Sequence, residues 1–415
     1  MAVRAPHLYR SLRLFALASF ALLSQDVEAG AEIPFAFEEH DGGRRPLYEY
    51  RPLVGAYVEA RAGRIAALPD AGTALEELRR EPAAAIYARA RATTAKPLSE
   101  RDALIGTLLV PLVVATAESC GGFDWSDEVF ERAYTALERS LFGERRTYAA
   151  AAPVVGLGAG SQIELGRGIR LRVAAAGEFT AHWPEASRLL PLQFGREPDR
   201  VCVLELERQL PRTETAPPDA PGELADAISA LRLATAAPLA GGPVLFERLD
   251  WRPFGIRPML PIAATQPPGE ASRLDAFRGK LARDLLERIS AADEDPELAE
   301  ALDRWELALF ASEPFRSELL REALTALLGG ADGLWAAAVR TALLLGETAR
   351  DRAGQLECLR ALGGAPADSS TADAVRRALV ETLLHGDRAV LVTALDESLL
   401  GLRSRPTGFL TAIAS

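Results

Sequence analysis

Residues 375–388, VRRALVETLLHGDR, decide how the C-terminal half of this chain is interpreted. Their apolar side chains follow helical spacing, and a glycine comes directly after the histidine. Such a glycine is typical of a helix C-cap, because a left-handed backbone costs least where there is no Cβ. We therefore expect a helix over 371–385 that ends before Gly386 and carries one of only four histidines in the chain.

The same helix supplies the candidate catalytic residues. Arg377, Glu381 and His385 follow one another at four-residue steps, so a turn of about 100° per residue places them in a ladder along one side. The negative end of the helix dipole and Glu381 both favour the charged form of His385, which could then act as a general acid or base. The alternative is an ordinary solvated helix face whose histidine bonds the last carbonyls.

The region around this helix is also helical from residue 273 onward. Helical spacing and Gly/Pro connections predict an antiparallel C-terminal bundle, in which Trp305 and Trp335 belong to the apolar core. Asp295 and Pro296 restart the chain as a helix, since proline fits the first helical turn. The expected helices cover 273–291, 296–310, 314–328, 333–346, 351–362, 371–385 and 390–402.

The middle of the chain predicts strands instead. Between 163 and 173 apolar residues alternate with polar ones, and Gly166-Arg167-Gly168 is typical of a hairpin turn. Further strands are expected at 200–210 and 241–252, separated by a Pro-rich loop at 211–223 and a helix at 224–235. The glycine-rich stretch at 154–160 resembles part of a dinucleotide fingerprint, but no clean helix follows it, so we reject that interpretation.

The N-terminal third is expected to be mostly helical, with helices at 9–23, 47–68, 104–117 and 128–141. Ser99 is a suitable N-cap, with Asp102 in the position of a capping-box carboxylate. The apolar run at 104–117 is too short to span a bilayer and predicts a buried helix. Residues 1–29 resemble a secretory signal in outline, which would make the protein exported. We favour a first amphipathic helix of a cytoplasmic protein, because Asp26 and Glu28 stand where signals are usually neutral.

Together these patterns predict a mainly α protein with a small β-rich middle segment, α+β overall. The expected domains are an N-terminal helical domain at 1–146, the β-rich segment at 147–265 and the C-terminal bundle at 266–415. A composition rich in Ala, Leu and Arg and poor in Lys is typical of a GC-rich bacterial genome.

Charge and cysteine content exclude several classes of function. With 47 basic and 58 acidic residues, the net charge of −11 leaves no domain-wide footprint for DNA or RNA, so RNA would need a local basic patch. Cys120, Cys202 and Cys358 are far apart and none lies in a CxxC motif. We expect three buried thiols, and neither a disulfide framework nor a metal site nor a cofactor.

Residues 304–405 resemble the C-terminal helical domain of the ApeA-like branch of the HEPN superfamily. The resemblance depends on three short pieces: RWELALF at 304–310, VRTALLLG at 339–346 and LHG at 384–386. They cover about 100 residues, under a quarter of the chain, and the motifs are short.

This resemblance implies a metal-independent endoribonuclease, often completed across a dimer, of the kind found in phage defence and toxin-type responses. His385 would act as general acid or base on RNA, Arg377 would hold the phosphate, and Glu381 would orient the imidazole. Arg377 lies further from His385 than the family's spacing, so the bundle could be a degenerate, RNase-derived module that serves in dimerisation. The alternative function is a non-catalytic helical scaffold or interaction protein, with no membrane association.

Overall fold

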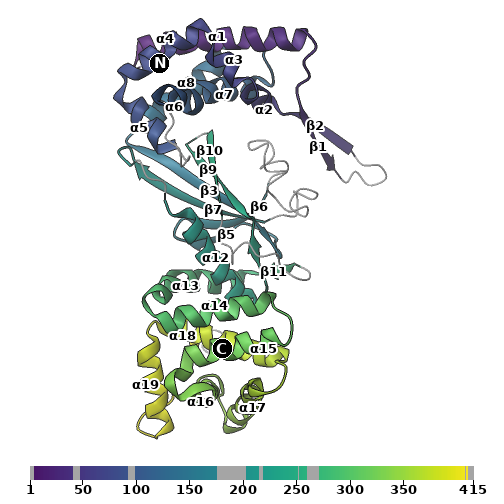
Figure 1. Ribbon diagram of the computed structural model, residues 1–415, viewed down its shortest axis with the longest axis vertical. Coiled ribbons are helices and arrows are strands. Elements are labelled where there is room, and N and C mark those ends of the chain that lie inside the picture. The colour runs from purple at the N-terminus through teal and green to yellow at the C-terminus, as the bar shows by residue number, and fades with distance from the viewer. Residues whose placement is uncertain are drawn as a thin grey trace.

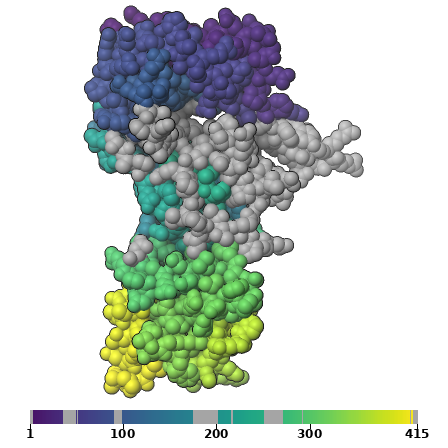
Figure 2. Space-filling model, in the orientation of Figure 1, coloured from purple at the N-terminus to yellow at the C-terminus, as the bar shows by residue number. Residues whose placement is uncertain are grey.

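The computed structural model describes residues 4–40, 47–91, 99–174, 202–214, 218–250, 252–258, 271–406 and 408–409. It confirms a mostly helical α+β chain with an antiparallel sheet. N-terminal helices form one end of an elongated molecule, the sheet lies in the middle, and the C-terminal helices form the other end (Figures 1 and 2). The predicted domain boundary at 146 falls within a strand, and the one at 265 lies outside the described residues.

The first helix, α1 (Pro6–Glu28), is amphipathic and packs its apolar side into the N-terminal core. Leu12, Phe15 and Leu23 on that side are fully buried. Asp26, an acid that would be unusual in a secretory signal, forms ion pairs with Arg61 and Arg64. The other N-terminal helices are α2 (Val54–Glu59), α3 (Ala62–Ala66), α4 (Pro69–Arg80), α5 (Pro82–Arg91), α6 (Glu100–Leu104), α7 (Val110–Cys120) and α8 (Asp127–Phe142).

The single helix predicted at 47–68 is wrong in its first part. Leu47–Pro52 is strand β2, which pairs in antiparallel fashion with β1 (Phe35–His40). The hairpin projects from the N-terminal helices in Figure 1. The prediction of a helix was wrong here because the aromatic residues also fit a period of two. Pro52 ends the strand before the short helices α2 and α3.

The apolar run at 104–117 is a buried helix, as predicted. A π-helical turn, Ile105–Leu109, lies between α6 and α7 directly before Pro111. Such a turn accommodates a proline, which has no N–H to donate to the helix. Among the described residues, Glu100–Cys120 is long and apolar enough to cross a membrane by length and composition, with a mean hydropathy of 1.8. However, 56% of its most apolar stretch is buried inside the protein, as in the core helix of a soluble protein.

The sheet has the strand order β10-β9-β3-β7-β6-β5, and β8 pairs with β3 beside this path. Its centre is the long pair of β3 (Arg145–Val155) and β7 (Cys202–Pro211). The predicted hairpin is confirmed: Gly166, Arg167 and Gly168, all with positive φ, connect β5 (Ile163–Gly166) to β6 (Ile169–Val173). The remaining strands are β4 (Leu157–Ala159), β8 (Ala240–Gly241), β9 (Val244–Leu249), β10 (Arg252–Pro258) and β11 (Ser272–Leu274).

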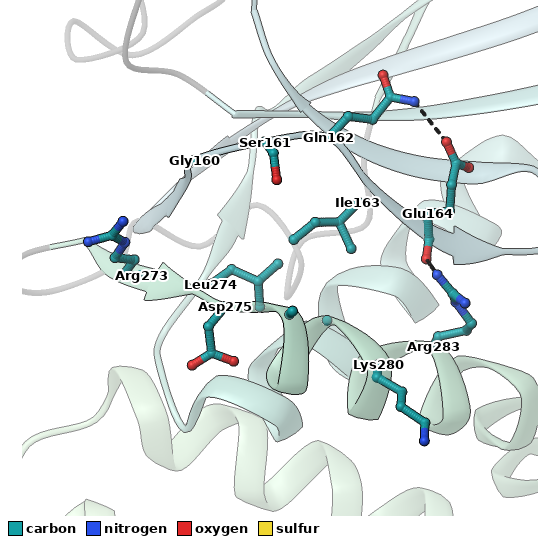
Figure 3. A pocket seen from close by; sticks show the side chains of 12 residues that line it. Gly160, Ser161, Gln162, Ile163, Glu164, Arg273, Leu274, Asp275, Lys280 and Arg283 are labelled. Carbon is teal, nitrogen blue, oxygen red and sulfur yellow. Dashed lines mark hydrogen bonds between the residues drawn. The ribbon is translucent and has the colours of Figure 1, made fainter.

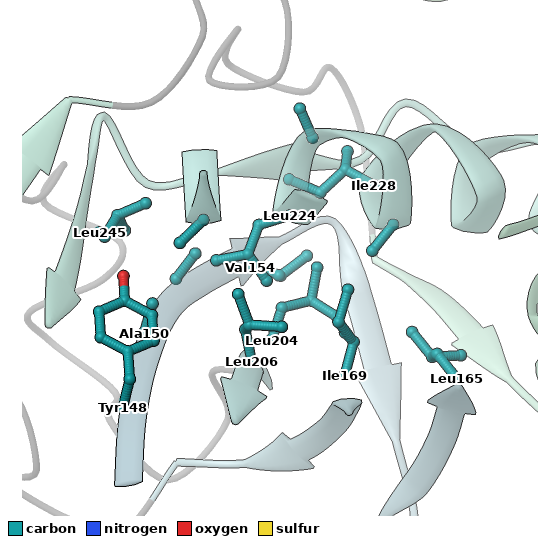
Figure 4. Close-up of a cluster of buried hydrophobic side chains, with 14 of the residues drawn as sticks. Tyr148, Ala150, Val154, Leu165, Ile169, Leu204, Leu206, Leu224, Ile228 and Leu245 are labelled. Carbon is teal, nitrogen blue, oxygen red and sulfur yellow. The ribbon is translucent and has the colours of Figure 1, made fainter. Parts of the chain in front are cut away.

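One face of the sheet is covered by α12 (Ala220–Thr235). Leu204 and Leu206 of β7 lie beneath Leu224 and Ile228 of this helix, and all four are fully buried (Figure 4). Because side chains alternate along a strand, the residues between them point to the opposite face. The Pro-rich loop is shorter than predicted, since β7 extends to Pro211 and α12 begins at Ala220.

The strand predicted at 241–252 is in fact two paired strands, β9 and β10, and the second extends to Pro258. β10 contains Pro253 and Pro258 yet pairs with β9, and its register shifts after Pro253. Proline is tolerated there because β10 is at the edge of the sheet, where one side of the strand needs no ladder hydrogen bonds. β11 then pairs in parallel with β4.

The C-terminal helices begin and end close to the predicted positions. Within the described residues, α18 contacts most of the other helices of this bundle. The helices are α13 (Ala276–Ile289), α14 (Pro296–Phe310), α15 (Phe315–Leu324), α16 (Gly333–Leu345), α17 (Ala349–Arg360), α18 (Ser369–His385) and α19 (Arg388–Leu399).

Two expectations about core residues need correction. Trp305 is buried as predicted, but Trp335 is 56% exposed and packs beneath the guanidinium of Arg360. Of the three cysteines only Cys202 is fully buried. Cys358 lies beside the hydroxyl of Thr371, at 2.7 Å, so it is a polar neighbour of the α18 N-terminus and not an apolar filler.

Candidate functional site

The helix that carries the candidate ladder, α18, is a core helix. It begins at the N-cap Asp368, whose carboxylate accepts the Thr371 amide at 2.7 Å, and it ends at Gly386 with φ of 87°. Hydrogen bonds from Thr371 and Ser370 lower the pKa of Asp368 to about 2. Buried residues surround the helix axis from Ala378 to Leu384. An ordinary solvated face, the simpler interpretation of the ladder, therefore does not describe this helix.

Glu381 is 3% exposed and is held by the end of the chain. One of its carboxylate oxygens, Oε2, accepts the backbone N–H of Phe409 at 2.7 Å. Four residues earlier in the chain, Arg405 donates to the carbonyl oxygens of Leu343 and Gly346 at the end of α16. The carboxylate thus binds a segment that crosses the bundle, a contact made 28 positions away in the sequence.

Arg377 and His385 lie half-buried on either side of Glu381 along the helix. Eight residues at about 1.5 Å each put their Cα atoms about 12 Å apart. In the described part of the chain, Nδ1 of His385 is buried without a hydrogen-bond partner. Arg377 and His385 thus stand about two helical turns apart, with Glu381 between them.

At the C-terminal end of α18, where His385 was expected to carry the positive charge, the guanidinium of Arg288 is bound instead. Its guanidinium, from α13, donates to the carbonyl oxygen of Leu384 in the last turn of α18. A Cβ added to Gly386 would lie 3.7 Å from the same guanidinium. Arginine thus supplies the positive charge that the negative end of the helix dipole attracts.

The residues behind the family resemblance hold the bundle together. Arg304 is exposed and pairs with Glu322 at 3.4 Å, while Trp305 beside it is buried. Arg340 binds Asp396 of α19 through two hydrogen bonds of 2.7 and 2.8 Å, and it also donates to the carbonyl of Leu328. A bidentate arginine–carboxylate pair of this kind fixes two helices relative to each other.

A cleft of about 550 Å³ lies elsewhere, between the β4–β5 connection and the start of α13 (Figure 3). Ile163 and Leu274 point into it, and Arg283 donates to the carbonyl of Glu164 at its rim. A Cβ added to Gly279 would lie 2.9 Å from Ile163, so this glycine allows the hairpin to approach the helix. None of the three predicted site residues lines the cleft. The helical periodicity of α13 does not indicate a cleft, and the only hint in its sequence is the glycine at position 279.

Sequence patterns also missed a group of charged residues on the sheet face opposite α12. We name Arg170, Arg172 and Arg248 the sheet arginine cluster; all three bind the carboxylate of Glu205, whose side chain is 2% exposed. Burial alone would raise the pKa of Glu205, but hydrogen bonds and charge from the cluster outweigh it and lower that pKa. The signal in the sequence was the pair Arg170 and Arg172, two apart on one predicted strand.

Within the part of the chain that the structure describes, no three His, Cys, Asp or Glu side chains gather to hold a metal ion. Comparisons of the chain with protein-family models, with curated proteins and with solved structures find no match.

Proposed function

We propose that this protein is a non-catalytic interaction protein, a scaffold of two helical bodies held apart by a sheet. The observation that carries the proposal is the environment of Glu381. Its carboxylate is 3% exposed and accepts the Phe409 amide, which supports a structural role for this residue in holding the segment around Phe409 against α18. The separation of about 12 Å between the Cα atoms of Arg377 and His385 along the helix also favours separate roles for these two residues.

In this proposal the HEPN-like resemblance concerns the fold of the C-terminal bundle and not its chemistry. Arg304, Trp305 and Arg340 make packing and ion-pair contacts within it, and Gly386 ends its central helix. These contacts support a structural role for the residues on which the resemblance depends. We propose a degenerate, RNase-derived module in a cytoplasmic protein, without RNA cleavage of its own.

We further propose that the C-terminal bundle joins two copies of the chain. Its outer surface carries three leucines at the end of α19, which we name the C-terminal leucine patch: Leu399, Leu400 and Leu402 are 47%, 74% and 75% exposed. Neighbouring exposed leucines of this kind mark interaction surfaces more often than solvated ones. A symmetric dimer would bring the same patch of each copy together.

Two experiments test the proposal. The purified chain is incubated with RNA in a buffer that contains EDTA, beside the variant His385→Ala. We expect no cleavage by either; cleavage by the unmodified chain that His385→Ala abolishes would overturn the non-catalytic function.

The second experiment measures the molecular mass by sedimentation. We expect the unmodified chain to sediment as a dimer and the combined variant Leu400→Glu/Leu402→Glu as a monomer. Leu14→Glu on α1, where the leucine is 48% exposed, is the matched control and should leave the dimer intact. A monomeric unmodified chain, or a dimer that survives the paired substitution, would contradict the proposed interface.

A further inference from the structure

The sheet arginine cluster lies on the face of the sheet that α12 does not cover. Leu204 and Leu206 point toward α12, so Glu205 between them points the other way. Arg170 pairs directly with Glu205 across β6 and β7, and Arg172 is two residues further along β6 on the same face. Arg248 reaches the site from β9, two strands away on the other side.

Small side chains on β3 allow this convergence. Ala151 is the direct partner of Glu205, and Ala149 is the direct partner of Arg248. Because alanine has no side chain beyond Cβ, the arginine can extend across β3 and bind the carboxylate on β7. Three guanidinium groups from two separate strands therefore meet above a floor of alanine.

Several charged side chains gather at this point of an acidic chain. Glu205 is bound by Arg170 at 2.9 and 3.1 Å and by Arg172 at 2.8 Å, and Glu207 lies 3.7 Å from Arg170. Among the residues that the structure describes, three guanidiniums and two carboxylates meet here. Each guanidinium has five N–H donors, and Glu205 accepts two hydrogen bonds from Arg170, one from Arg172 and one from Arg248.

The donors that remain are accessible from outside. The side chains of Arg170 and Arg248 are 32% and 44% exposed, whereas Glu205 beneath them is 2% exposed. Glu205 therefore orders the guanidiniums from below and leaves their outer edges toward solvent. Preorganised forks of this kind match the oxygen atoms of a phosphate group, which arginine binds through two parallel hydrogen bonds.

We propose that the sheet arginine cluster binds the phosphate group of a small ligand. The several oxygens of a phosphate can accept hydrogen bonds from the exposed edges of two arginines at once, and its negative charge favours these charge-assisted bonds. A polynucleotide is less favoured, because its affinity increases with the number of phosphates contacted and the chain as a whole carries −11. This site is independent of the proposed scaffold function and of α18.

The experiment is a calorimetric titration of the full chain with inorganic pyrophosphate, with inorganic phosphate and with a short single-stranded RNA. The variants are Arg248→Met and Arg170→Met, which remove a charge and keep an apolar stem. Arg10→Met, an exposed arginine of α1, is the control with the same change in net charge. Circular dichroism verifies that each variant is folded, and Arg248→Lys replaces Arg248→Met if that variant is not.

We expect saturable binding of pyrophosphate by the unmodified chain and by Arg10→Met. Loss of one charge-assisted contact should weaken the Kd by about tenfold or more in Arg248→Met and in Arg170→Met. No saturable binding of either phosphate probe overturns the proposal, and so does equal binding by the cluster variants and the control. RNA binding that both cluster variants lose and Arg10→Met keeps, without binding of either phosphate probe, would assign the cluster to a polynucleotide instead.

Discussion

The joint between the sheet and the C-terminal bundle depends on one buried ion pair, and its removal should be costly. Arg232 of α12 and Glu306 of α14 meet at 2.7 Å with side chains that are 0% and 3% exposed. Arg232 also donates to the carbonyl of Leu239 and lies over the ring of Phe310. The substitution Glu306→Leu introduces an apolar side chain of similar size and leaves the guanidinium of Arg232 without its carboxylate.

The expected loss follows from what remains buried. Removing one partner of a buried pair leaves an uncompensated charge and costs about 3–5 kcal/mol in the free energy of unfolding. Replacing both partners, as in Arg232→Met/Glu306→Leu, removes that charge and should return stability to within about 1 kcal/mol of the unmodified chain. Arg304→Met on the same helix is the control, because its pair with Glu322 is 41% and 40% exposed and contributes about 0–1 kcal/mol.

Urea unfolding followed by far-UV circular dichroism measures these differences. Trp305 stands beside Glu306 and is buried, so tryptophan fluorescence offers a second probe that includes this helix. A loss of unfolding free energy below about 1 kcal/mol in Glu306→Leu would refute the reasoning, because a buried arginine would then carry no large cost without its carboxylate. A double variant as unstable as the single one would refute it too, since the cost would lie in packing and not in charge.

Three further predictions concern the contacts of α13 and α18. Gly279→Ala should destabilise the fold by about 1–3 kcal/mol through overpacking, because the new Cβ would meet Ile163 at 2.9 Å; thermal unfolding measures this, and an unchanged midpoint counts against it. Asp368→Asn should reduce the loss of folding free energy at acid pH. The pKa of Asp368 is lowered to about 2, so its stabilising contribution is present above its ordinary pKa and is lost as pH falls toward 2. Urea titrations across that pH range measure the difference. Phe409→Pro removes the amide donor to Glu381 and should cost about 1.5–3 kcal/mol, with faster hydrogen exchange in α18; equal exchange would deny the contact its role.

The helices of the bundle were predictable because their signals are local. Asp295 caps α14 by accepting two backbone amides, and Pro296 occupies the first turn. Gly386 ends α18 in the left-handed conformation that its sequence position indicates. Caps and breakers act within a few residues, so a single sequence contains all the information that they use.

The candidate site was not predictable for the opposite reason. Glu381 is buried because Phe409 donates to it from 28 positions away, and no periodicity reports such a contact. Glu205 is likewise buried among arginines of two other strands, although a carboxylate in a strand usually indicates a solvated position. The prediction for Trp335 was wrong in the opposite sense. Its helical spacing indicated a core position, but the side chain packs against Arg360 at the surface.

The cases of Glu205 and Trp335 share one physical cause, the use of arginine at contacts between elements. Arg376 of α18 donates to the carbonyl of Leu233 at the end of α12, and Arg388 of α19 binds Asp295 before α14. A guanidinium can satisfy a carboxylate or several carbonyl oxygens while its stem packs against apolar neighbours, so it joins surfaces that periodicity assigns to solvent. Arginines bound in this way are not available to an anionic partner. A ligand of that kind is therefore expected where bound guanidiniums keep an edge exposed to solvent, as Arg170 and Arg248 of the sheet arginine cluster do.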